Sequence, residues 1–229
     1  MTVVQPRYAI YFTPPVDHPL TQAAVAWLGR DAFDPANTPA IVHRDASLTT
    51  EPRRYGFHAT LKAPFRLAPE ARIEDFEAAV ARFAATHRPF PVVPLRLEQI
   101  GGFYALVPDA PCPALNDFAG AVVGAFDGFR APPTDDELAR RKQADLDDVE
   151  TAHLERWGYP YVFERFRFHM TLSNRVTGEE ASSIEPELRD RFDALARNGI
   201  LIDALALFEE SEPGADFHVR SYFQLGAGL

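Results

Sequence analysis

A five-residue pattern occurs twice in this chain at widely separated positions, and it constrains the fold more than any other feature. The copies are Phe57–Leu61 (Phe-His-Ala-Thr-Leu) and Phe168–Leu172 (Phe-His-Met-Thr-Leu). Both are short and apolar with no helical periodicity, which predicts β-strands. Because side chains two apart on a strand share a face, each copy should present His and Thr together, backed by an apolar face.

The alternation extends each polar face beyond the repeat. The predicted faces are His58, Thr60 and Lys62 in the first copy, and Arg167, His169, Thr171 and Ser173 in the second. Two explanations are open. The copies could be duplicated structural strands whose histidines hydrogen-bond within the fold, or they could form two halves of one functional site.

Length and composition limit the class of protein. With 229 residues, 46% of them hydrophobic, the chain can bury a core in one domain or in two small lobes. It has no long apolar run, and its start does not read as a signal peptide, so we expect a cytoplasmic protein without membrane contact. The single cysteine, Cys112, excludes an internal disulfide and a cysteine-based metal cluster. The prolines on either side of it predict a turn or a helix start.

The charge distribution bears on the partner. A formal net charge of −10 argues against binding a long nucleic acid, because such proteins usually carry a basic face. A small anionic substrate needs only local positive charge. Basic residues do gather around the two motif copies: Arg53, Arg54, Lys62, Arg165, Arg167 and Arg175.

The same order of elements is predicted after each motif copy. After the first, a helix follows Pro69 and two strands over 92–99 and 103–107 join at Gly101-Gly102. After the second, a helix over 186–197 precedes strands over 202–209 and 217–225. The fold class is therefore α+β, with two duplicated lobes of antiparallel sheet, helices packed outside and a pseudo-two-fold axis. We expect one bilobal domain over 1–229, with halves 1–110 and 111–229, and one motif strand from each lobe at a central cleft.

Other segments are predicted outside the repeat. A strand over 7–13 and a helix from Asp17 to Gly29 open the chain, and 31–54 is expected to be irregular. A helix over 114–126 precedes a polar helical insertion over 134–157, which starts with a capping-box pattern at Thr134–Glu137. The insertion is either a solvated helix or a lid whose Arg140 or Arg141 contacts a distal anionic group of the substrate.

Two histidines facing one substrate can divide the work of a general acid and a general base without a metal or another cofactor. The paired threonines can donate hydrogen bonds to phosphate oxygens, and Lys62 and Arg167 would add positive charge. A metal site at the two histidines is the less favoured alternative, because no carboxylate shares their faces. The remaining histidines are expected at the surface or in caps: His18, His43, His87, His153 and His218. Of these, His43 lies in the irregular segment near the site. The sequence has no His-Glu-x-x-His, no Gly-rich phosphate loop ending in Gly-Lys and no Gly-x-Ser-x-Gly.

The stretches 54–62, 157–162 and 166–172 resemble the two-histidine phosphoesterase superfamily, which includes RNA 2′,3′-cyclic phosphodiesterases and 2′-5′ RNA ligases. They resemble more closely the proteins encoded in bacterial phosphonate-utilisation operons. The resemblance implies a metal-independent phosphodiesterase with His58, Thr60, His169 and Thr171 in the catalytic positions. It also implies a small phosphorylated substrate, such as a cyclic phosphate on a phosphorylated ribose.

The leading hypothesis is hydrolysis of a small cyclic phosphodiester, with Lys62, Arg167, Ser173 and Tyr161 as substrate-binding residues. An RNA-end cyclic phosphodiesterase or ligase-like activity is one alternative, and a non-catalytic protein that binds a phosphorylated metabolite is another. The sequence assigns neither histidine to acid or base and gives no oligomeric state.

Overall fold

The computed structural model describes residues 5–37, 39–41, 45–134, 137–138 and 145–228. Its main element is a seven-stranded sheet in the order β4-β5-β6-β2-β1-β8-β9, in which all neighbouring strands are antiparallel, and β3 and β7 pair separately. The strands are β1 (Arg7–Phe12), β2 (Ala59–Phe65), β3 (Phe90–Val92), β4 (Leu95–Ile100), β5 (Phe103–Pro108), β6 (Met170–Arg175), β7 (Ile200–Ile202), β8 (Ala204–Glu210) and β9 (His218–Gln224).

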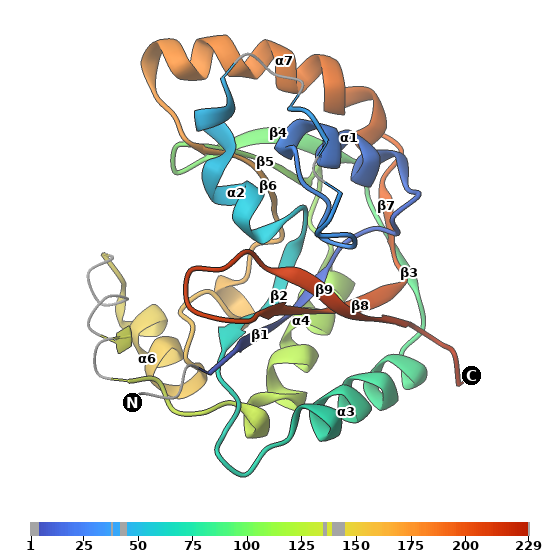
Figure 1. Cartoon of the computed structure of the whole chain (residues 1–229), viewed down its shortest axis with the longest axis vertical. Coiled ribbons are helices and arrows are strands. Elements are labelled where there is room, and N and C mark those ends of the chain that lie inside the picture. Colours follow the sequence, from blue (N-terminus) through green and yellow to red (C-terminus); the bar gives the residue numbers. More distant parts are fainter. Residues whose placement is uncertain (1–4, 38, 42–44, 135–136, 139–144, 229) are drawn as a thin grey trace.

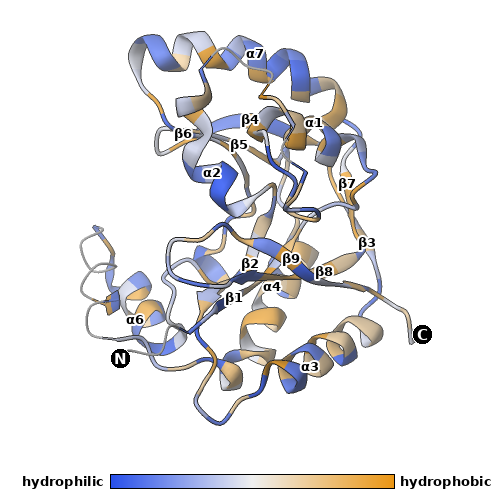
Figure 2. Cartoon of the chain, viewed as in Figure 1, coloured by the Kyte–Doolittle hydropathy of each residue, from blue (hydrophilic) through white to orange (hydrophobic). Residues whose placement is uncertain are grey.

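Helices cover both ends of this sheet (Figure 1). Helices α1 (Pro19–Leu28), α2 (Thr50–Tyr55) and α7 (Gly178–Ala196) lie with β4, β5 and β6, whereas α3 (Ile73–Thr86) and α4 (Pro113–Ala125) lie on the side of β1, β8 and β9. Polar and apolar residues alternate along α3 and α7 (Figure 2), as expected of helices with one face on the core. No helix in the described part of the chain is long and apolar enough to cross a membrane.

The predicted α+β duplication is confirmed, with an exchange of strands between the halves. The order β2-α3-β3-β4-β5 is repeated as β6-α7-β7-β8-β9. Strand β5 pairs with β6, and β8 pairs with β1. Helix α7 consequently packs on β4, and α3 packs on β8 and β9. The sequence halves 1–110 and 111–229 are thus interleaved within one sheet.

The two motif strands are neighbours in the centre of this sheet. Between β2 and β6 the register contains a single pair, Ala59 with Met170, whereas β1 and β8 are paired at five positions. Both Ala59 and Met170 are fully buried. The sheet is therefore continuous at the motif and separates on either side of it.

Two predicted helix starts were wrong. Helix α1 begins at Pro19, and its N-cap is His18, whose Nδ1 accepts a hydrogen bond from the Leu20 amide at 3.2 Å, instead of Asp17. This confirms a capping role for His18. Helix α7 begins at Gly178 and runs through Pro186, because its buried stripe at Ile184, Leu188 and Phe192 continues across the proline. Packing of that stripe outweighs the hydrogen bond that proline removes.

The expectation of an irregular segment over 31–54 was wrong at its end. A 3-10 turn, η1 (Ala46–Thr49), leads into α2. Asn174 at the end of β6 holds them: its side-chain oxygen accepts from the Glu51 amide at 2.8 Å, and its side-chain nitrogen donates to Ser47 O and to the Thr50 hydroxyl, each at 2.8 Å. A partner so distant in the sequence leaves no local signal, which is why pattern reasoning missed this helix.

The polar insertion is not one helix. The predicted capping box is confirmed at its start, where the Thr134 amide donates to the Glu137 carboxylate at 2.8 Å and the Glu137 amide donates to the Thr134 hydroxyl at 3.2 Å. Residues 145–147 are not helical, and α6 (Asp148–Trp157) starts anew with its own capping box between Asp147 and Glu150. The proposed lid residues Arg140 and Arg141 lie outside the described residues.

Candidate active site

The single registered pair between the motif strands determines how the four polar side chains meet. In an antiparallel pair with Ala59 opposite Met170, continuing the register places His58 opposite Thr171 and Thr60 opposite His169. These four residues occupy the face opposite to the buried Ala59 and Met170. The fold thus brings both His-x-Thr copies into one cluster around a local pseudo-two-fold axis, with each histidine across from the threonine of the other copy.

The backbone holds both imidazoles in the same way. Nδ1 of His58 lies 2.9 Å from the Gly56 carbonyl oxygen, and Nδ1 of His169 lies 2.8 Å from the Arg167 carbonyl oxygen. Because a carbonyl can only accept, Nδ1 carries the proton in each neutral ring and Nε2 keeps its lone pair. Nε2 of His58 is 3.3 Å from the Thr60 hydroxyl, which then donates to it. In both copies Nε2 is therefore the ring nitrogen that can accept or donate a proton during catalysis.

The surroundings of His58 are aromatic. The Tyr11 ring stacks on it with centroids 3.8 Å apart, and Phe208 and Tyr55 lie at 6.0 and 6.1 Å. Tyr11 is placed there by the sheet, since it pairs with Thr60 across β1 and β2. The pKa of His58 is lowered to about 4, mainly by desolvation; the hydrogen bond to the Gly56 carbonyl opposes this shift, and the nearby His169 adds to it. At neutral pH this ring is an uncharged hydrogen-bond acceptor.

His169 lies in a more open setting. Phe103 is its aromatic neighbour at 5.7 Å, and the ring borders a cavity of about 450 Å³ together with Thr60. Burial lowers the pKa of His169 below its ordinary value of 6.5, opposed by its hydrogen bond to the Arg167 carbonyl. The two histidines therefore share a tautomer and differ in their contact with the cavity.

The predicted position of Lys62 on the histidine face was wrong. Tyr11 pairs with Thr60, but Ile10 pairs with Lys62, so Leu61 is an extra residue in β2 and forms a bulge. The bulge turns Lys62 to the face of the buried Ile10. Its ammonium donates to the Val123 carbonyl oxygen at 3.2 Å and contacts Asp127 at 3.3 Å. Lys62 thus lines a different, smaller cavity.

Ser173 is also directed away from the cluster. Strand β5 pairs Ala105 with Thr171 but Phe103 with Arg175, which leaves extra residues in β6 after Thr171. Within this irregular stretch the Ser173 hydroxyl accepts from the Tyr104 amide at 2.9 Å and donates to the Asn174 carbonyl at 2.8 Å. Both of these hydrogen bonds are made within the sheet, and the Ser173 side chain is buried. Its contacts therefore do not fit the expectation that it binds substrate.

Arg167 and Tyr161 lie where a substrate could reach them. Both are exposed and line the cavity beside His169. Two further arginines near the second motif, Arg165 and Arg175, line it as well. Of the basic residues before the first motif, Arg54 instead pairs with the buried carboxylate of Glu210 and supports the fold.

Sequence reasoning missed the aromatic residues that surround the histidines. Tyr11 lies in the strand predicted over 7–13, and Phe103 follows the Gly101-Gly102 turn. The available signal was a phenol that needs a partner for its hydroxyl when it is buried in a strand. His43 lies outside the described residues. No group of three or more His, Cys, Asp or Glu side chains in the described part is arranged to hold a metal ion.

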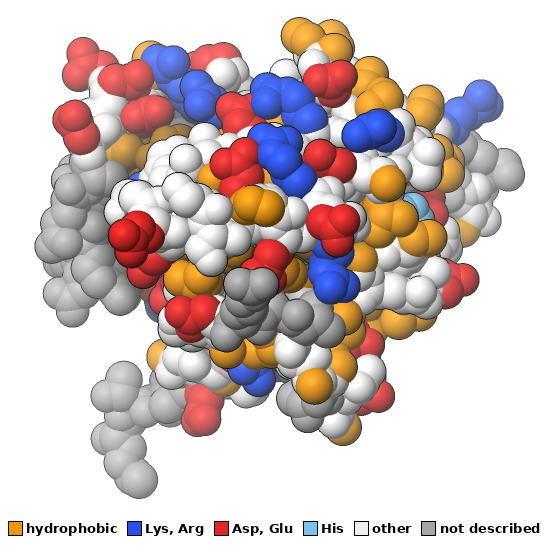
Figure 3. Space-filling view, turned by 90° about the horizontal axis from the view of Figure 1, so that it is seen from above, with side chains coloured by type: hydrophobic (Ala, Val, Ile, Leu, Met, Phe, Trp, Pro, Cys, Tyr) orange, Lys and Arg blue, Asp and Glu red, His pale blue; other side chains and the backbone are white. Residues whose placement is uncertain are grey.

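Figure 3, which looks onto the α7 end of the molecule, shows acidic and basic side chains interspersed, with no continuous basic surface on that face. Basic side chains line both cavities near the motif strands: Arg165, Arg167 and Arg175 with Glu150 and Glu164 in the larger one, and Lys62, Arg66 and Arg130 with Glu137 in the smaller one.

The fold and site define a class of protein: a two-lobed α+β domain in which two exchanged halves each supply one His-x-Thr strand to a shared cluster. The chain belongs to the family described as "Protein of unknown function (DUF1045)", whose model matches residues 60–218.

Two curated relatives carry the name "Ribose 1,5-bisphosphate phosphokinase PhnN". The protein from Janthinobacterium sp. (strain Marseille) is 40% identical over 221 residues, covering 92% of this chain and 49% of its own length. The protein from Laribacter hongkongensis (strain HLHK9) is 36% identical over 229 residues, covering 97% and 53%. The chain thus spans about half the length of the curated relatives it matches.

Solved structures with a similar arrangement include TT0787 of Thermus thermophilus, at 16% identity and a TM-score of 0.46, covering 97% of this chain and 100% of that one. E. coli LigT complexed with NADP+ is 12% identical with a TM-score of 0.46, covering 97% and 99%.

Proposed function

We propose that this protein hydrolyses a small cyclic phosphodiester by acid–base catalysis with two histidines. The observation that supports the proposal is the registered pair of motif strands, which gathers the two histidines and two threonines on one face, with His169 and Thr60 lining a cavity. Four groups of these types can surround one phosphorus atom: two that move protons and two that donate hydrogen bonds to phosphate oxygens.

In this proposal His58 is the general base and His169 the general acid. The half-buried His58 is neutral, so its Nε2 can take a proton from water while the resulting hydroxide attacks phosphorus. The P–O bond within the cyclic phosphate then breaks, and protonated His169 gives its proton to the departing alkoxide oxygen. A positive charge on His169 also helps to keep His58 uncharged. The product is a phosphomonoester with a free hydroxyl.

The substrate class that we propose is a cyclic phosphate on a phosphorylated ribose, in phosphonate metabolism. The resemblance of the motif stretches to phosphonate-operon proteins supports it, as does the PhnN name of the relatives. That name describes a kinase, but it belongs to proteins about twice as long as the matched region. We place the kinase activity in their other half, because this sequence lacks a Gly-rich phosphate loop ending in Gly-Lys.

The test is hydrolysis of cyclic ribose phosphates and of 2′,3′-cyclic nucleotides by the purified protein, followed by ³¹P NMR in the presence of a chelator. We expect conversion to a phosphomonoester, and loss of turnover in the double variant His58→Ala/His169→Ala. Undiminished turnover in that variant would refute the site. Turnover of RNA ends but not of ribose phosphates would favour the RNA-processing alternative.

A further inference from the structure

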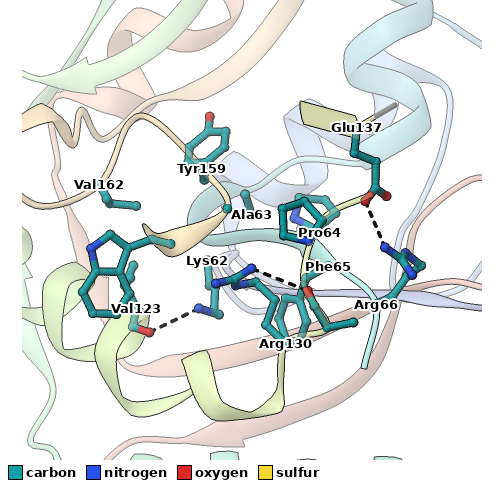
Figure 4. Close-up of a pocket in the computed structure, with 14 residues that line it drawn as sticks. Lys62, Ala63, Pro64, Phe65, Arg66, Val123, Arg130, Glu137, Tyr159 and Val162 are labelled. Carbon is teal, nitrogen blue, oxygen red and sulfur yellow. Dashed lines mark hydrogen bonds and ion pairs between the residues drawn. The ribbon is translucent and has the colours of Figure 1, made fainter. Parts of the chain in front are cut away.

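A second cavity lies behind the first motif strand, on the face to which the bulge turns Lys62. It measures about 30 Å³ and is lined by Lys62, Arg66, Arg130, Glu137, Trp157 and Tyr159 among others (Figure 4). A single water needs roughly 10–15 Å³ of such space, so this cavity has room for a small ion. Tyr159 also lines the larger cavity beside His169, so the two cavities are neighbours.

Among the residues that the structure describes, the charges around this cavity do not balance. One carboxylate, Asp127, accepts from three cations: Arg130 Nε at 2.8 Å, Arg156 Nη1 at 3.1 Å and Lys62 Nζ at 3.3 Å. The Lys62 side chain is 4% exposed and that of Arg130 is 12% exposed, whereas Arg156 is 65% exposed and its charge is met by water. Two largely buried cations thus share one carboxylate.

The remaining charged residues at the cavity do not remove the excess. Arg66 and Glu137 also line it, but their side chains pair with each other at 2.9 Å and cancel (Figure 4). Within the described ranges, Lys62, Arg130 and Asp127 therefore leave about one positive charge beside this cavity. A largely buried charge without a counter-charge is costly, and a bound anion would compensate it.

We infer that this cavity is a binding site for a phosphate-sized oxyanion, held by Lys62 and Arg130. Lysine offers a point charge with three donors, and arginine offers a planar fork of N–H groups, which are the groups that proteins use for phosphate. Some of these donors already bond to Val123 O, Arg156 O, Ala131 O and Asp127, which accepts from Lys62 and from both Nε and Nη2 of Arg130. The others remain for an anion. The anion is either free phosphate or a phosphate group carried by a sugar.

The site can be tested without catalysis. In the His58→Ala/His169→Ala background, which removes the motif histidines, titration calorimetry with inorganic phosphate should show saturable binding. Lys62→Met removes the charge while keeping the side-chain length, and should weaken binding about tenfold or more. The control Arg72→Met removes an exposed cation that pairs with Glu74 and should leave binding unchanged. A melting curve of each variant establishes that it is folded.

A variant that removes a negative charge from the same cluster separates anion binding from a structural role of the cluster. Asp127→Asn removes negative charge and should bind phosphate at least as tightly as the background protein. Equal weakening by Lys62→Met and Asp127→Asn would mean that the cluster only supports the fold, and this would overturn the inference. Absence of saturable binding up to millimolar phosphate would also overturn it. Should Lys62→Met fail to fold, Arg130→Gln takes its place beside Asp127→Asn.

Ribose 5-phosphate then distinguishes the two sources of the anion. Displacement of inorganic phosphate by ribose 5-phosphate would assign the site to a phosphate carried by a sugar. Phosphate binding without such displacement would assign it to the free ion. None of these measurements requires turnover. The anion site can therefore be refuted while the proposed hydrolysis is supported, and the hydrolysis can be refuted while the anion site is supported.

Discussion

The two motif copies have the same five-residue pattern and the same hydrogen bond from Nδ1, yet their surroundings differ. His58 is stacked on Tyr11 in the middle of the sheet, whereas His169 borders a 450 Å³ cavity. Desolvation takes the pKa of His58 to about 4 and lowers that of His169 as well. A duplicated motif can thus supply two chemically different groups, because burial rather than residue type sets the proton affinity.

The largest effect is expected from removing either imidazole. His58→Ala and His169→Ala should each lower kcat by roughly 10²- to 10⁴-fold, the usual contribution of a positioned acid or base. Steady-state rates on the cyclic ribose phosphate measure this. His218→Ala, which changes a histidine on β9 outside the cluster, is the control and should retain full activity. A large loss in only one motif variant would contradict the proposed division of labour.

The threonines should matter nearly as much. Thr60→Val and Thr171→Val keep the shape of each side chain and remove the donor, and we expect kcat to fall by about 10²-fold for each. Thr60 also donates to Nε2 of His58, so Thr60→Val should alter the pH dependence as well. A rise in KM with unaltered kcat would show that the hydroxyls bind the substrate and the transition state equally, and would contradict the proposed role.

The carbonyls that hold the imidazoles offer a third test of the comparison. Gly56 has φ of 73°, and a Cβ there would lie 2.6 Å from the Ala32 Cβ. Gly56→Ala should therefore lower the free energy of unfolding by about 1–3 kcal/mol and reduce activity through His58. The equivalent residue in the second copy is Arg167, so Arg167→Ala should leave the melting temperature unchanged. Equal melting temperatures for the two variants would contradict this difference.

The pH profile follows from the two lowered pKa values. The base His58 must be unprotonated, so kcat/KM should fall as pH drops through about 4. The acid His169 must be protonated, so kcat/KM should also fall as pH rises through its pKa, which lies below 6.5. The expected profile of the free enzyme is a bell with its optimum on the acid side of neutrality. A flat profile between pH 4 and 7 would contradict the assignment.

The smallest expected effect tests what makes the pKa of His58 differ from that of His169. Tyr11→Ala removes the stacked ring and should raise the pKa of His58 from about 4 toward 6.5, as read by NMR titration of the imidazole. Phe103→Ala should raise the pKa of His169 by less, because that ring already borders the cavity. Tyr11→Phe keeps the stacking and is the control. An unchanged pKa of His58 in Tyr11→Ala would mean that burial by Tyr11 is not the cause.

Much of the fold could be read from local patterns. The repeated motif followed by helix, strand and strand predicted the duplication, and Gly101-Gly102 predicted the hairpin between β4 and β5. The alternation predicted that Phe57, Ala59 and Leu61 are buried, and they are. These predictions succeeded because periodicity and turn chemistry act over a few residues.

The sequence by itself determined that each copy carries His and Thr on one face over an apolar back, since alternation along a strand is a local property. Only the tertiary structure decided that β2 and β6 meet at Ala59 and Met170, and that a bulge in β2 and an irregularity in β6 turn Lys62 and Ser173 away. It also decided that Tyr11 rather than solvent covers His58. Register, bulges and stacking depend on partners far away in the chain, and no local pattern encodes which partner a strand will find.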